Sequence, residues 1–218
     1  MEITADAPRV RPKLRGVLHA AGFVVACVVG AFFVDATHGK RLVAAAVFAG
    51  SAATMLGASA LYHRIWWSPR ARPRMRRVDH AGIYLLIAGT YTPVGLLSLH
   101  GSIQRTVLGV VWAGAAAAIV TKICWVSAPK WLSAVFGITL GWIGIAAMPQ
   151  LAHSAGFAAV ALLAAGGIAY TLGAIVYARR RPDPIPAVFG YHEIFHALTL
   201  VALGCQYVAI ALFVVKVG

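Results

Sequence analysis

Charged side chains are scarce in this sequence: they make up 11% of its 218 residues, and only six of them are acidic. A soluble globular domain carries about a quarter charged residues. Long polar stretches are missing as well, which leaves no room for a separate soluble domain. With 61% hydrophobic residues and a mean hydropathy of +0.81, the composition instead indicates an integral membrane protein.

Cysteine is also scarce. Cys27, Cys124 and Cys205 each stand alone in an apolar stretch, without a paired spacing such as C-x-x-C. This excludes a disulfide framework and a thiolate metal site. We interpret the three thiols as small core residues.

Seven apolar stretches are present, and each is close to the roughly 20 residues that a helix needs to cross a bilayer. The first is longer than the roughly 7 to 15 apolar residues of a signal peptide, so we expect it to remain as a span. The fold class is therefore an all-α bundle of seven transmembrane helices, in one domain over residues 16–218, after a short polar tail at 1–15. The stretches are Gly16–Val34, Leu42–Tyr62, Asp79–Leu99, Ile103–Trp125, Trp131–Met148, Gly156–Ala178 and Val188–Val215.

The net charge of +13 is distributed unevenly. Fifteen of the 19 lysines and arginines lie in the amino-terminal tail and in the second, fourth and sixth loops. Positive loops stay in the cytoplasm, so we expect a cytoplasmic amino terminus, an external carboxyl terminus and a place in the inner (cytoplasmic) membrane. The same distribution argues against nucleic acid as a partner and favours contact of the basic loops with anionic lipid headgroups.

Five polar residues are expected at one depth near the cytoplasmic face. Ser59 and His63 form an i, i+4 pair at the end of the second span, His192 and His196 form another at the start of the seventh, and Asp79 opens the third. Three imidazoles fit zinc and leave a coordination position for water. The pattern predicts zinc at His63, His192 and His196, with Asp79 holding or deprotonating the bound water and Ser59 orienting it. We interpret His19 and His80 as packed or headgroup-contacting residues.

These residues also carry a resemblance. The chain resembles the haemolysin III branch of the progestin and adipoQ receptor superfamily, from about residue 16 to the end. The resemblance implies a seven-helix bundle, zinc held by His63, His192 and His196, and Asp79 and Ser59 beside a zinc-bound water. The matching motifs are Ser59-x-x-x-His63, Val78-Asp79-His80-Ala-Gly-Ile-Tyr84, Thr90-Tyr91-Thr92-Pro93 and His192-x-x-x-His196.

Adiponectin receptors of this superfamily are linked to ceramide hydrolysis, and the bacterial branch takes its name from a cytolytic activity. The resemblance therefore implies a zinc-dependent hydrolase of a ceramide-like lipid amide or an ester, with membrane lipids as partners. Two alternatives stay open. One is a pore-forming or membrane-stress protein with structural zinc. The other is a membrane metalloprotease, because His192-Glu193-Ile194-Phe195-His196 also fits H-E-x-x-H, in which the glutamate is the general base.

Overall fold

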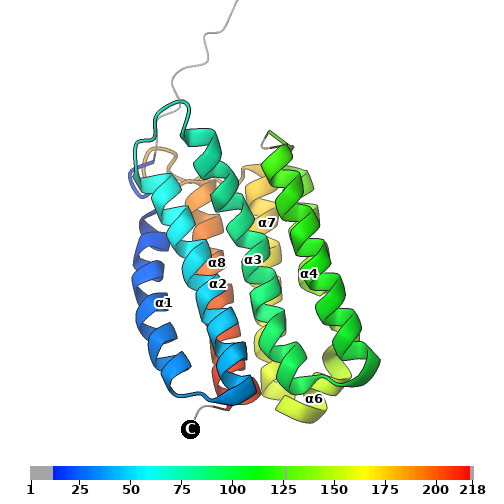
Figure 1. The fold of residues 1–218 in the computed structure, drawn as a ribbon. Coiled ribbons are helices and arrows are strands. Elements are labelled where there is room, and N and C mark those ends of the chain that lie inside the picture. Colours follow the sequence, from blue (N-terminus) through cyan, green and yellow to red (C-terminus); the bar gives the residue numbers. More distant parts are fainter. Residues whose placement is uncertain (1–11, 126, 217–218) are drawn as a thin grey trace, which may run out of the picture.

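The computed structural model describes residues 12–125 and 127–216. These residues form one bundle of seven helices that are long and apolar enough to cross a membrane, and they contain no β-strand (Figure 1). The predicted all-α, seven-span fold is confirmed. The helices are α1 (Val17–Asp35), α2 (Gly39–Arg64), α3 (Arg72–Ser98), α4 (Gly101–Cys124), α5 (Lys130–Trp142), α6 (Met148–Ala155), α7 (Phe157–Arg179) and α8 (Tyr191–Val208). The fifth span consists of α5, a 3-10 turn at Ile143–Ala147 and α6, and the seventh continues beyond α8 as a π-helical segment at Ala209–Val215.

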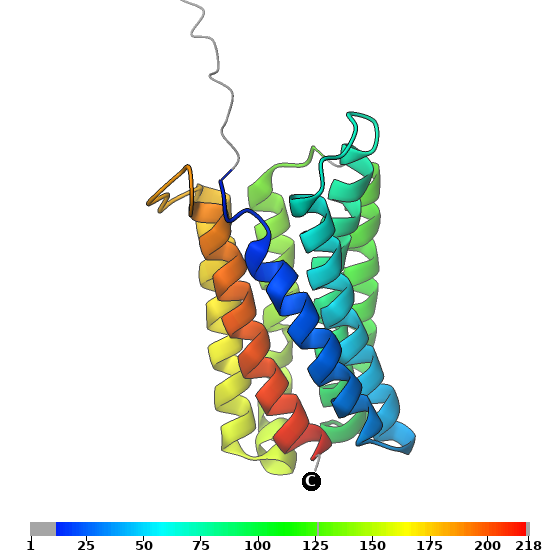
Figure 2. The same ribbon diagram turned by 90° about the vertical axis from the view of Figure 1, so that its left-hand side faces the viewer.

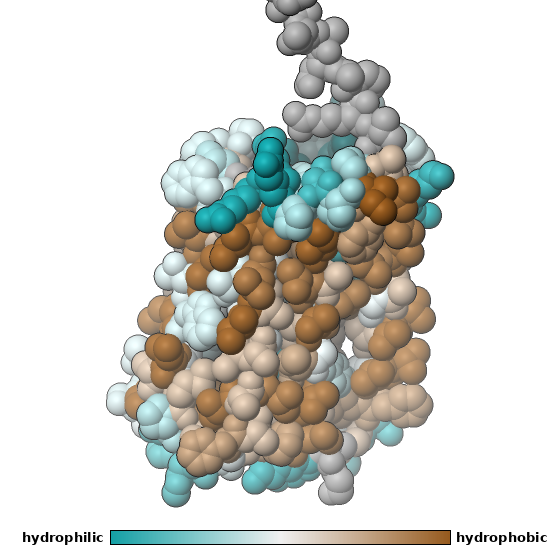
Figure 3. All heavy atoms as spheres, turned by 180° about the vertical axis from the view of Figure 1, so that it is seen from behind, coloured by the Kyte–Doolittle hydropathy of each residue, from teal (hydrophilic) through white to brown (hydrophobic). Residues whose placement is uncertain are grey.

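On the face shown in Figure 3, hydrophobic side chains cover the middle of the bundle, between hydrophilic residues at its two ends. Large apolar side chains are exposed on the surface of the bundle; Phe32 is 72% exposed and Phe157 is 82% exposed. Such exposure is costly in water and favourable against lipid tails. The chain is a multi-pass membrane protein. Cys27 and Cys124 lie on this exposed surface too, so their interpretation as core residues was wrong.

The third span begins earlier than predicted. α3 starts at Arg72, so Asp79 lies seven residues inside the helix, about 10 Å along its axis, rather than at its first residue. Proline is well tolerated in the first turn of a helix, and Pro73 occupies that turn here. The basic first turns of α3 therefore extend the helix beyond the apolar stretch, and Asp79 is buried within the bundle.

The amino-terminal segment closes one end of the bundle. Residues 1–11 of the predicted tail lie outside the described part of the chain. The amides of Lys13 and Leu14 donate hydrogen bonds to the carbonyls of Ala187 and Val188, in the loop before α8. This end also carries the α2–α3 loop, whereas the segment Ala209–Val215 reaches the opposite end (Figures 1 and 2). The pairing fixes Arg15 beside the first turn of α8.

Helices α2 and α3 approach each other closely because two glycines of α3 face α2. A Cβ atom on Gly82 would lie 3.0 Å from the Cα of Met55. A Cβ atom on Gly89 would clash with the side chain of Ser51 and lie 3.3 Å from the carbonyl oxygen of Val47. Small residues at such contacts allow the close packing that holds membrane helices together. The pair presents His63 and Asp79 to the same side of the bundle.

We expect Gly89→Ala to destabilise the bundle by about 1–3 kcal/mol, because the added methyl group overpacks the contact with α2. Gly50→Ala is the matched control, since a Cβ atom at Gly50 meets no atom within 4 Å. Thermal unfolding of the two variants in detergent micelles tests this. Equal melting temperatures for both would contradict the close α2–α3 contact.

Candidate metal centre

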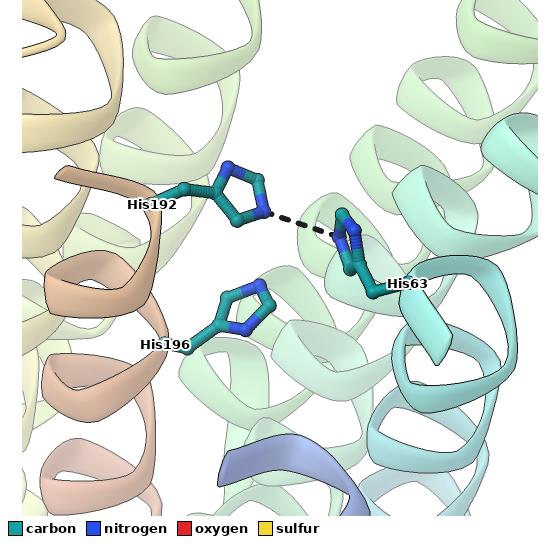
Figure 4. Close-up of side chains that lie close together, drawn as sticks. All are labelled: His63, His192 and His196. Atoms are coloured by element: carbon teal, nitrogen blue, oxygen red, sulfur yellow. Dashed lines mark hydrogen bonds between the residues drawn. The ribbon is translucent and has the colours of Figure 1, made fainter. Parts of the chain in front are cut away.

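Three histidines converge near one end of the bundle, as Figure 4 shows. His63 extends from the last turn of α2, and His192 and His196 extend from the first two turns of α8. One ring nitrogen from each lies within 4.8 Å of those of the other two, and a hydrogen bond of 3.1 Å joins the Nε2 atoms of His63 and His192. The structure thus brings together the three predicted ligands, although their role as ligands stays a prediction.

The geometry and chemistry of this triad fit a metal ion. Tetrahedral zinc with bonds of 2.0–2.1 Å separates its nitrogen ligands by about 3.3 Å, close to the observed 3.1 Å between His63 and His192. His196 is only 2% exposed, and its Nδ1 atom is buried without a hydrogen-bond partner among the described residues. Burying imidazoles without polar partners is costly. A divalent cation shared by the three rings removes much of that cost, so the triad can bind a metal.

Asp79 and Ser59 lie beside the triad. The Oδ2 atom of Asp79 is 3.8 Å from the Nε2 atom of His63, close enough for an ion pair with a protonated ring but too far for a hydrogen bond. The Ser59 side chain lies close enough to interact with the same carboxyl group. Both side chains are buried and line the cavity next to the triad. An acid and a hydroxyl group therefore lie beside the three imidazoles, at the polar end of the cavity.

His19 supports the triad from α1. Its ring stacks on that of His196, with the ring centroids 3.7 Å apart and an angle of 11° between the planes. A hydrogen bond of 2.8 Å joins its Nδ1 atom to the Ser59 hydroxyl. The sequence interpretation as a packed residue is correct, but it missed what His19 packs against. An ionisable residue within an otherwise apolar span was the signal that could have revealed it.

Glu193 does not face the metal centre, although it lies between His192 and His196 in the chain. It is fully buried, and its Oε1 atom lies 2.7 Å from Nε of Arg15. Its Oε2 atom accepts a hydrogen bond of 2.9 Å from the amide of Gly190, which caps α8. Both carboxylate oxygens are therefore engaged in fixing the start of α8 to the amino-terminal segment.

A cavity of about 140 Å³ extends from the triad into the bundle. Asp79, Ser59, His192 and His196 line its polar end, and its walls along α3, α5 and α7 are mainly apolar. A second cavity of about 70 Å³ shares Thr90 and Gln206 with the first, and the Thr90 hydroxyl donates a hydrogen bond of 3.3 Å to Oε1 of Gln206. The histidine site thus adjoins a mainly apolar cavity within the bundle.

Comparisons with known proteins identify one family and several similar proteins. The model of the family described as "Haemolysin-III related" matches residues 8–207. The chain is 34% identical over 176 residues to the hemolysin-3 homolog of Bacillus subtilis, and the aligned region covers 81% of this chain and 79% of that protein. It is 39% identical over 119 residues to hemolysin-3 of Bacillus cereus, covering 55% and 54% of the two chains. It is also 30% identical over 192 residues to the heptahelical transmembrane protein ADIPOR2 of rice, covering 75% and 79%.

We expect the purified protein to retain about one divalent metal ion per chain, and His196→Ala to lower the occupancy about tenfold or more, because it removes one of three ligands. His153→Ala is the control, since His153 is exposed and lies outside the cavity. Inductively coupled plasma mass spectrometry of the desalted proteins measures the metal directly. The same metal content in both variants would show that the triad is not a metal site.

Proposed function

Because this chain belongs to the haemolysin-III related family, we propose that it is a zinc-dependent membrane hydrolase that cleaves an amide or ester bond of a lipid. The observation that carries the proposal is the buried triad of His63, His192 and His196, with Asp79 beside it, at the polar end of an apolar cavity. A water-soluble substrate does not require an apolar cavity inside a membrane bundle, whereas the acyl chain of a lipid does.

Zinc is the ion that this donor set favours, because three imidazoles without a thiolate or a second carboxylate suit its tetrahedral preference. When bound, zinc supplies Lewis acidity, which makes water a nucleophile at neutral pH. His63, His192 and His196 hold the ion in this scheme. The stacking of His19 on His196 and its hydrogen bond to Ser59 restrict the orientation of the site from α1.

Asp79 and Ser59 supply the remaining chemistry. Asp79 accepts a proton from the attacking water as the new carbon–oxygen bond forms at the lipid carbonyl. As the carbon–nitrogen or carbon–oxygen bond breaks, Asp79 returns that proton to the departing amine or alcohol. The products are a fatty acid and the amine or alcohol to which it was joined. Ser59, which lies between His19 and Asp79, orients the carboxyl group and the water.

The substrate enters from the bilayer in this proposal. Gly137 and Gly141 of α5 line the cavity, and α5 presents much of its surface to lipid. A wall built of glycine leaves room for a lipid chain to pass between helices. The likeness to the rice ADIPOR2 protein and the resemblance to adiponectin receptors favour a ceramide-like substrate.

We further place the histidine end of the bundle on the cytoplasmic side of the inner membrane. The loops at this end hold most of the basic residues, and positive loops remain in the cytoplasm. We expect a green fluorescent protein fused to the amino terminus to fluoresce and alkaline phosphatase fused to the carboxyl terminus to be active. Active alkaline phosphatase fused to the amino terminus would show that this terminus lies outside the cytoplasm, which would contradict the proposed orientation.

The two alternative functions have less support. A pore-forming protein with structural zinc agrees with the name hemolysin-3 of the Bacillus cereus relative. However, the two cavities found among the described residues, of about 140 and 70 Å³, are too small for a wide aqueous channel in one chain. A metalloprotease needs Glu193 to face the ion, whereas that carboxylate is engaged by Arg15 and Gly190.

Asp79→Asn separates these functions. We expect it to lower the hydrolysis of a fluorescent ceramide about 100-fold or more, the usual effect of losing a general base, while the zinc content stays unchanged. Glu193→Gln is the matched control and should retain hydrolysis within about tenfold, because the amide can still cap α8. The assay uses protein in liposomes that also contain an entrapped dye, with and without a chelator.

Three results would contradict the proposal. Loss of activity in Glu193→Gln but not in Asp79→Asn would favour the protease. Hydrolysis that persists after the zinc has been removed would exclude a catalytic ion. Dye leakage without hydrolysis, insensitive to the chelator, would favour a pore.

A further inference from the structure

A buried lysine in the cavity is not used by the proposed reaction. Lys122 lies in the last turn of α4 and is only 1% exposed. A lysine near a membrane surface ordinarily extends its ammonium group to water or to headgroups. The Nζ atom of Lys122 is instead buried, and it makes no hydrogen bond with any residue in the described part of the chain. Its side chain lines the cavity that begins at the histidine triad.

No described carboxylate forms an ion pair with this ammonium group. Arg76, which acts on Lys122 electrostatically, is itself a cation. Among the described acids, Glu193 pairs with Arg15, Asp183 accepts the amide of Tyr191, Asp79 lies beside His63 and Ser59, and Asp35 is exposed at the far end of α1. A buried ammonium group without an anion is unfavourable. The cavity wall therefore holds a positive charge that has no ion-pair partner among the described residues.

The rest of the cavity wall indicates what would neutralise that charge. Ile83, Ile87 and Ile138 provide apolar surface in the same cavity. A small hydrophilic anion would compensate Lys122 but would leave these side chains without contacts. An anionic amphiphile satisfies both the charge of Lys122 and the apolar wall. Its anionic oxygen atoms accept charge-assisted hydrogen bonds from the ammonium group, and its chain covers the apolar side chains.

We propose that Lys122 is a recognition residue for an anionic oxygen group, a carboxylate or a phosphate, carried by an amphiphile whose apolar chain occupies this cavity. The inference rests on the proposed function only in placing a lipid in the cavity, and it requires neither zinc nor turnover. If hydrolysis occurs, Lys122 makes the protein selective for anionic lipids over neutral lipids with the same chain.

Binding measurements with three oleoyl ligands test this selectivity. The ligands are oleate, oleoyl lysophosphatidate and the neutral monoolein, which share one chain and differ in the headgroup. We expect the full chain, in nanodiscs of phosphatidylcholine, to bind the two anionic ligands about 10- to 100-fold more tightly than monoolein, as one charged hydrogen bond allows. Native mass spectrometry or isothermal titration calorimetry measures each dissociation constant, and the ratio between oleate and lysophosphatidate identifies which anion is preferred.

Variants assign the preference to this lysine. Lys122→Met, which keeps the length of the side chain without its charge, should abolish the preference and leave monoolein binding unchanged. Lys122→Arg should retain it. Lys13→Met is the matched control, because Lys13 lies at the same end of the bundle but is exposed. Lys122→Met should melt no lower than the wild type, since it removes an unpaired buried charge.

The binding assay is repeated after treatment with a chelator, so that its result is independent of the metal centre. A preference that survives the chelator and disappears in Lys122→Met supports the proposal even if no hydrolysis is ever observed. A preference that the chelator abolishes and Lys122→Met retains would assign the anion to the metal centre instead. Equal affinities of the wild type for oleate and monoolein, or equally strong competition by inorganic phosphate, would also overturn the proposal.

Discussion

An ionisable group inside a membrane bundle must find a partner there, because lipid tails offer none. This constraint organises one end of the molecule. The polar groups of His19, His63, Asp79, His192, Glu193 and His196 are all buried at that end, and most of them contact one another. The apolar helices form the scaffold, and the contacts among these buried polar groups determine how the helices pack at that end.

The two carboxylates of this end have different partners. Glu193 lies in the first turn of α8, where Arg15 neutralises its charge and the amide of Gly190 donates a hydrogen bond to it. Asp79 forms no described ion pair with an arginine, although Arg76 acts on it electrostatically, and it lies beside His63 and Ser59. A carboxylate already held by a cation and an amide has little capacity left for proton transfer. The partners, rather than the residue type, make Asp79 the candidate base and Glu193 a structural residue.

The histidine triad and the cavity depend on the same packing. The glycines of α3 let α2 approach, which brings His63 toward α8, and the amino-terminal segment holds α8 in place through Arg15. Thr90 and Gln206 continue the polar contacts deeper in the bundle. A ligand in the cavity would therefore contact the histidine triad as well as the apolar side chains of α3 and α5.

The sequence by itself determined the membrane class, the seven spans and the i, i+4 histidine pairs, because hydropathy and helical spacing are local properties. Those local patterns also sufficed to place His63, Asp79, His192 and His196 at one depth. Only the packing of the helices decided that Glu193 pairs with Arg15, that His19 stacks on His196 and that Lys122 lines a cavity. Each of these contacts joins residues far apart in the chain or depends on how several helices pack. Such contacts depend on the rotation of each helix about its axis and on how the helices pack, and the spacing of residues along one helix determines neither.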